Sequence, residues 1–134
     1  MKKILLILFL LLIPKLSWSY FYNAEDVYQK CISDTDVQFG VCVGYIVGVY
    51  DVLVNKNIVD HRIKEKKGEL YGFKLCDVSK VANNSQLVDI FIDFVKKNPK
   101  KRNQSAEGII NNTLIVWLEC GTPTTIEYLK EAGY

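Results

Sequence analysis

Four cysteines and one histidine are the residues of this 134-residue chain whose side chains have the most distinctive chemistry. An even number of cysteines in an exported domain is typical of disulfides, whereas the same number in the cytosol would indicate metal binding or redox chemistry. No two cysteines form a Cys-x-x-Cys pair, and His61 is the only histidine. The sequence therefore predicts no metal site, and nothing in it indicates a cofactor. The cysteines are Cys31, Cys42, Cys76 and Cys120.

Two carboxylates are the next candidates for chemistry. Asp89 and Asp93 are four residues apart in a stretch with helical periodicity, so both side chains share one face of the helix. The carboxylates of glycosidases usually converge from different elements across a cleft, and Lys96 and Lys97 offset the charge here. We therefore interpret Asp89 and Asp93 as part of the polar, solvent-facing side of this helix. His61 has no serine or cysteine motif around it, so we predict no catalytic residue and a protein that is not an enzyme.

The first 19 residues have the pattern of a secretory signal peptide. Lys2 and Lys3 are followed by an apolar run over 4–13 and by the small residues Ser17 and Ser19. Ten apolar residues are too few to cross a bilayer. We expect export, cleavage after Ser19, and a mature chain that is not bound to a membrane. The remaining residues 20–134 are enough for a single domain with one core.

The net charge changes when this segment is removed. Residues 1–19 contain three lysines and no acid, so the formal net charge goes from +2 for the full chain to −1 for the mature one. The basic balance belongs to the signal peptide, and binding to nucleic acid is not indicated.

The other elements must pack around the stretch 36–55. No charged or amide side chain occurs between Phe39 and Tyr50. A strand is an alternative, but Gly40, Gly44 and Gly48 share one face of a helix and let another helix approach closely, whereas on a strand they would weaken it. The pattern predicts a helix that is apolar nearly all round and therefore buried nearly all round. The residues expected at its helix contacts, in the core or at a dimer seam, are Gly40, Gly44, Tyr45 and Gly48.

The rest of the chain shows further helices and one charged connection. Apolar residues recur at three- and four-residue spacing, and Asn, Ser and Thr stand where helix caps are expected. The connection 56–75 is rich in charge and is predicted to be mostly a solvated, mobile crossover, although part of it, near 58–66, could extend the preceding helix. The expected helices are 20–32, 86–97, one that follows Asn103 to Ser105 and ends at Glu119, and a short one from Pro123.

The helix order predicts how the cysteines pair. Cys31 ends the first helix and Cys42 begins the second after a short turn, so the two are neighbours. The short loop after residue 97 predicts an antiparallel hairpin, which places Cys120 beside Cys76. The expected fold is all-α, with four or five helices around a central glycine-rich helix and two disulfides.

The order of these motifs resembles the Rap/Tai family of immunity proteins. The resemblance runs from about Cys31 to Cys120, and its most specific part is the block 42–51 with the order of the four cysteines. The segment 55–76 looks longer and more charged than in the family, and Asp77 stands where a proline is common. The motifs are Cys42-Val43-Gly44-Tyr45-Ile46-Val47-Gly48-Val49-Tyr50-Asp51, Leu75-Cys76, Val95-Lys96-Lys97-Asn98-Pro99 and Trp117-Leu118-Glu119-Cys120.

The resemblance implies a small helical protein of the periplasm, often a homodimer, that binds and blocks a peptidoglycan amidase delivered by type VI secretion. The alternative is a general periplasmic stability factor or chaperone-like protein without a cognate toxin, which would bind many unfolded clients weakly. From exposure alone, we expect the partner to contact the polar edge of the third helix and the turn after it, with the crossover 56–75 as the second candidate. That edge comprises Asp89, Asp93, Lys96, Lys97, Lys100, Lys101 and Arg102.

Overall fold

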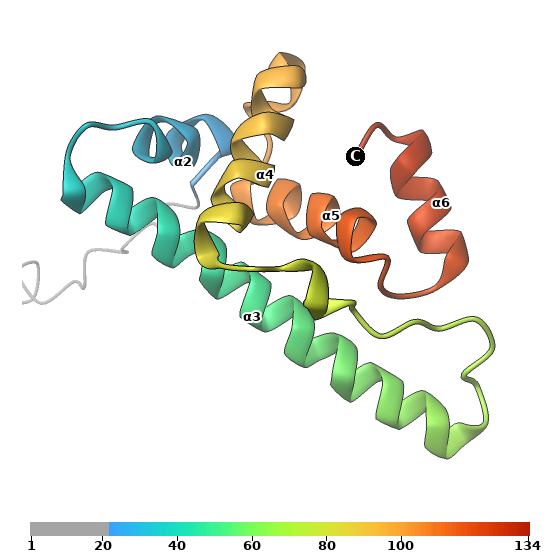
Figure 1. Cartoon of the computed structure of the whole chain (residues 1–134). Coiled ribbons are helices and arrows are strands. Elements are labelled where there is room, and N and C mark those ends of the chain that lie inside the picture. The colour runs from blue at the N-terminus through green and yellow to red at the C-terminus, as the bar shows by residue number, and fades with distance from the viewer. Residues whose placement is uncertain (1–21) are drawn as a thin grey trace, which may run out of the picture.

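A computed structural model describes residues 22–134, which form five α-helices and no β-strand (Figure 1). The predicted signal peptide, residues 1–19, lies outside the described residues. The predicted all-α fold with two disulfides is confirmed. Two short 3₁₀ helices, η1 (Val78–Lys80) and η2 (Pro99–Lys101), lie in the connections before α4 and after it.

The first described helix, α2 (Ala24–Cys31), starts later than predicted. The side chain of Asn23 accepts a hydrogen bond from the Asp26 backbone N–H (2.8 Å), and the Asp26 carboxylate accepts one from the Asn23 N–H (3.2 Å). This capping box fixes the start of the helix. Asn23 is extended and forms a β-bridge with Ser105 before α5, and the Ala106 N–H donates to the Tyr22 carbonyl (3.0 Å).

The glycine-rich helix, α3 (Asp36–Lys67), is longer than predicted and contains most of the expected crossover. Its charged second half continues the helix because lysine and glutamate are good helix formers and because Lys56 and Asp60 pair at i, i+4 (2.5 Å). Gly68, with a φ of 71°, ends it in the left-handed conformation. The crossover proper is therefore the shorter segment 68–83. The prediction of a loop from residue 56 is wrong, and the alternative that residues near 58–66 extend the helix is confirmed.

The remaining helices are α4 (Asn84–Lys97), α5 (Ala106–Leu118) and α6 (Pro123–Glu131). Side chains of Asn83, Ser105 and Thr122 cap their N-termini, as the sequence indicated for the first two. In Figure 1, α4 and α5 cross instead of lying antiparallel, so the predicted hairpin geometry is wrong. Glu119 ends α5 with a φ of 54°.

All other helices lie on one side of α3 (Figure 1). α2, α4 and α5 pack over its first half, and its second half projects past them with the crossover returning above it. One apolar cluster fills the space between these four helices. Its largest fully buried side chains include Ile46, Leu87, Phe91, Ile109, Ile110, Leu114 and Leu118.

The expectation that α3 is buried nearly all round is wrong for the single chain. Of its 32 residues only Cys42, Ile46, Leu53 and Asn57 are buried. The three glycines of the predicted contact face are exposed, and a Cβ atom placed on any of them would meet nothing within 4 Å. Tyr45 is half-buried and packs edge-on against Tyr22, with ring centroids 5.8 Å apart.

Both predicted disulfides are present and no described cysteine is free. Cys31–Cys42 joins the end of α2 to α3, and Cys76–Cys120 joins the crossover to the residues after α5. The second pairing arises although α4 and α5 cross, because the backbone of Lys74 bonds to that of Gly121 in both directions (2.8 and 2.9 Å). The crossover is thereby held against the end of α5.

Candidate functional site

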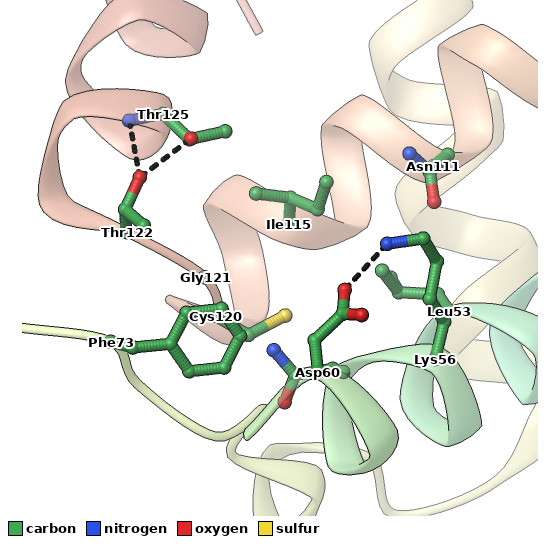
Figure 2. A pocket seen from close by; sticks show the side chains of 11 residues that line it. Leu53, Lys56, Asp60, Phe73, Asn111, Ile115, Cys120, Gly121, Thr122 and Thr125 are labelled. Atoms are coloured by element: carbon green, nitrogen blue, oxygen red, sulfur yellow. Dashed lines mark hydrogen bonds and ion pairs between the residues drawn. The ribbon is translucent and has the colours of Figure 1, made fainter. Parts of the chain in front are cut away.

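A pocket of about 230 Å³ opens between α3, the end of the crossover, α5 and the start of α6 (Figure 2). Its lining combines apolar and polar side chains. Leu53 and Ile115 approach it from α3 and α5, and Phe73 closes it on the crossover side. The polar lining consists of Lys56, Asn57, Asp60, Asn111, Thr122 and Thr125.

Asn57 fixes the crossover to α3. Its side chain is only 6% exposed. Its amide nitrogen donates to the Lys74 carbonyl (3.2 Å), and its amide oxygen accepts from the Cys76 N–H (2.9 Å). Both polar atoms are thus satisfied, as a buried amide requires. This asparagine, which the sequence analysis did not identify, supports the wall of the pocket.

The rim groups pair with one another. Lys56 and Asp60 form the ion pair shown in Figure 2. The Thr122 hydroxyl caps α6 by accepting from the Thr125 N–H (3.2 Å), and the two hydroxyl oxygens lie 2.7 Å apart. Cys120 is in a disulfide and supplies no thiol. The lining can hydrogen-bond and pack against a partner, but it contains no pair of a nucleophile and a base.

The tip of the crossover carries a fully exposed aromatic side chain, Tyr71. It lies between Gly68 and Gly72, whose φ angles of 71° and 70° suit glycine. Next to it, the ring of Phe73 packs against two side chains of α3: its centroid lies 6.1 Å from that of the His61 ring and 5.7 Å from the Lys64 ammonium nitrogen. His61 is therefore half-buried against Phe73.

The polar edge predicted to bind a partner is divided by the structure. Asp89, Asp93, Lys96, Lys97 and Lys100 are exposed on α4 and after it, and Asp93 pairs with Lys97 (2.6 Å).

Lys101 and Arg102, from the same predicted edge, are engaged within the fold. Lys101 donates to the Ala132 carbonyl (2.6 Å) and lies over the ring of Tyr134 (3.7 Å). Arg102 pairs with Glu25 (3.3 Å). These two side chains hold the C-terminus and α2 in place, and only the other five present free surface.

A third surface is the uncovered side of α3. A shallow groove of about 470 Å³ runs along it beside α5. Burial raises the pKa of the Tyr45 hydroxyl in this groove, and the nearby Glu107 carboxylate acts in the same direction. α3 is also the one helix of the described residues that is long and apolar enough to cross a membrane by length and composition. The groove is lined by Gly44, Tyr45, Gly48, Val49, Val52, Glu107 and Asn111.

Within residues 22–134, no three histidine, cysteine, aspartate or glutamate side chains lie close enough together to hold a metal ion.

A comparison with protein families matches residues 23–120 to the family of Rap1a immunity proteins. The matched region runs from the cap of α2 to the last cysteine, so it includes both disulfides, the whole of α3 and the crossover. No curated protein and no solved structure matches the chain.

Proposed function

This chain belongs to the family of Rap1a immunity proteins, and on that basis we propose that it binds and inhibits a peptidoglycan amidase that rival cells deliver by type VI secretion. Family membership implies immunity to a secreted effector. The amidase, the periplasm as the site of action, and a homodimeric form are the finer parts of the proposal. The single observation that carries it is the match over residues 23–120. Inhibition is proposed to be stoichiometric, by binding, without catalysis.

The periplasm is supported by the signal-peptide pattern of residues 1–19 and by the two disulfides. Disulfides persist in oxidising compartments such as the periplasm and are rare in the cytosol. A peptidoglycan amidase has its substrate in the same compartment. Inhibitor and target would therefore meet there.

The crossover with its adjoining pocket is the surface we propose for the effector. Tyr71 is fully exposed, and Leu75 and Val78 nearby are about half exposed. Aromatic side chains are enriched among the residues that dominate binding energy at interfaces. Asn57, the Cys76–Cys120 disulfide and the Lys74–Gly121 backbone bonds hold the base of this segment. Little ordering entropy would be lost when it docks.

The exposed part of the α4 edge is the second candidate surface. Removing its charges should change the rate at which the protein associates with the effector, and the dependence of that rate on salt, more than the affinity of the complex. Asp93 and Lys97 already pair with each other. Their loss should therefore have a smaller effect on inhibition than the loss of Tyr71.

The test uses a type VI amidase effector from the same group of bacteria as the source of this protein, exported to the periplasm of a laboratory bacterium with or without this protein. We expect lysis without it and growth with it. Equal lysis in both strains would show that the protein does not confer immunity to that effector. A purified assay, with release of peptides from isolated peptidoglycan as the readout, checks that one bound copy of the protein blocks one amidase.

Three variants locate the surface. Tyr71→Asp should abolish protection, and the double charge reversal of Asp93 and Lys97 should weaken it slightly. Asp34→Lys, in the turn between α2 and α3, is the control, because this side chain is exposed and lies on neither surface. Full protection by Tyr71→Asp together with loss in the double reversal would move the contact to α4.

A further inference from the structure

A second pocket, of about 280 Å³, opens between α4 and α5 beside Tyr134. The two helices cross in Figure 1, and both contribute side chains to its lining. The crossover, which we propose as the effector surface, contributes none. We call it the α4–α5 pocket. More than half of its lining is aromatic or aliphatic: Ile90, Phe94, Val116, Trp117 and Tyr134.

One polar side chain that lines this pocket, Thr113, is buried without a hydrogen-bond partner. The residue is 9% exposed, and no described residue donates to its hydroxyl oxygen or accepts from it. Most buried hydroxyls in native proteins are paired, because an unpaired one has lost its bonds to water without replacing them. A molecule held in the pocket would supply the missing partner.

The aromatic wall of the pocket is held in place before any ligand binds. The rings of Phe94 and Tyr134 are stacked, with centroids 5.3 Å apart and an interplanar angle of 5°. The Tyr134 N–H donates to the Leu129 carbonyl (3.0 Å), and the Tyr134 hydroxyl donates to the Gln104 side chain (3.3 Å). Little ordering entropy would therefore be lost when a ligand enters.

The charges of the lining are already paired. Asp93 and Lys97 form an ion pair (2.6 Å), and both side chains are mostly exposed. Among the described residues, no other charged side chain lines the pocket. An ionic ligand would lose hydration there without gaining a partner. A sugar would bring several hydroxyls to a largely apolar lining with one buried hydroxyl left to bond. The lining therefore suits a neutral ligand with few polar groups.

The volume of the pocket sets the size of the ligand. A cavity of about 150 Å³ admits benzene, and drug-sized ligands occupy pockets of about 300 Å³ or more. A pocket of about 280 Å³ therefore suits a single ring with substituents or two fused rings. Aromatic rings pack favourably edge-on or offset against other aromatic rings, and Phe94, Trp117 and Tyr134 offer such partners.

We propose that the α4–α5 pocket binds a free, neutral aromatic molecule with one hydrogen-bonding group, whose ring packs against the aromatic lining and whose polar group bonds to the Thr113 hydroxyl. A hydroxyl both donates and accepts, so a phenol O–H and an indole N–H are equally suitable. The proposal goes beyond immunity, because it adds a small ligand to a protein whose proposed partner is an enzyme. A molecule in this pocket leaves Tyr71 on the crossover free to contact the effector.

The test titrates the mature chain 20–134 with p-cresol and follows the fluorescence of Trp117. Trp117 is the only tryptophan of this chain, since Trp18 lies in the predicted signal peptide. p-Cresol is neutral and carries one hydroxyl, and p-xylene has the same shape with a methyl group in its place. We expect a saturable change in emission with both probes, and a dissociation constant for p-cresol on the order of 0.1–1 mM.

Thr113→Val replaces the buried hydroxyl by a methyl group of similar size. It should weaken p-cresol binding about five- to tenfold, and leave p-xylene binding unchanged. It should also melt at no lower temperature than the wild type, because the hydroxyl that it removes has no partner. Thr35→Val, the same change on an exposed residue between α2 and α3, is the matched control and should bind both probes like the wild type.

Val116→Phe gives a second readout, because it adds a ring to the lining and should weaken both probes. Undiminished binding in this variant would place the probes elsewhere and overturn the proposal. A wild type that binds neither probe at millimolar concentration would overturn it and leave the Thr113 hydroxyl to an ordered water. Unchanged p-cresol affinity in Thr113→Val would overturn the assigned contact. A capped tyrosine peptide that binds more tightly than p-cresol would overturn the free ligand in favour of a protein side chain.

Discussion

The two sides of α3 have similar residue types and opposite environments. On one side Cys42 and Ile46 are fully buried, and on the other Val37 and Val52 are exposed. An apolar pattern that runs around a helix therefore does not say which side the rest of the chain covers. The covered side is fixed by its attachments: the Cys31–Cys42 disulfide to α2, and the hydrogen bonds of Asn57 to the crossover.

The largest difference between the two sides should appear in the free energy of unfolding when one aliphatic side chain on each side is truncated to alanine. Ile46→Ala removes a fully buried side chain and should lower the free energy of unfolding by about 2–5 kcal/mol. Val52→Ala, on a residue 65% exposed, should change it by less than about 0.5 kcal/mol for the monomer. Urea unfolding at concentrations below dimer formation measures both. Equal losses for the two variants would contradict the assignment of the buried side.

The Cys31–Cys42 disulfide, on the buried side of α3, should make the next largest contribution to the free energy of unfolding. Replacing Cys31 and Cys42 by alanine releases a loop with a sequence separation of 11 residues, for which loop entropy gives an upper figure of about 3 kcal/mol. The longer Cys76–Cys120 loop, with a separation of 44, should give about 4 kcal/mol as its own upper figure, and loosen the crossover as well. Thermal unfolding of each double variant ranks the two bridges. The opposite ranking would mean that native packing, rather than chain entropy, decides their contributions.

Replacing Asn57 tests the hydrogen bonds that join the buried side of α3 to the crossover. Asn57→Ala leaves the Cys76 N–H and the Lys74 carbonyl without their partner, and should lower stability by about 1–3 kcal/mol. Hydrogen exchange should show the loss first in the amide of Cys76, while the amides of α4 stay protected. Asn55→Ala, on an exposed position of the same helix, serves as control.

Tyr45, at the border of the two sides, should give the smallest effect. Burial and the Glu107 carboxylate raise the pKa of its hydroxyl above 10.0, so the folded state holds this proton more tightly than the unfolded state does. The stability that results is complete below pH 10 and is lost as the pH rises through the folded pKa. Between pH 9 and pH 11, wild type should lose slightly more stability than Tyr45→Phe in urea titrations. A steeper loss in the variant would contradict the sign.

Local signals in the sequence were sufficient for several features. The caps at Asn83 and Ser105, the five helices and the Cys31–Cys42 pair follow from short-range chemistry and chain order. The Cys76–Cys120 pair was predicted correctly, but from an antiparallel arrangement of α4 and α5 that the structure does not have. The polar edge of α4 was placed on the surface correctly, but Lys101 and Arg102 were not recognised as internal contacts. Their partners, Tyr134 and Glu25, are far away in sequence, and contacts between residues so far apart cannot be predicted from a local sequence pattern. For the same reason Asn57 was missed: its partners lie 17 and 19 residues further along.

The sequence by itself was enough to predict an all-helical chain with two disulfides that is related to immunity proteins, because caps, periodicity and cysteine order are local properties. Only the tertiary structure decided that α3 continues to Lys67, that the crossover is short and held by Asn57, and that the glycines face outward. Burial depends on where distant helices dock. A helix that is apolar on all sides can be covered by other helices on any of them. In this chain the contacts with α2, α4 and α5 determine which side of α3 is buried.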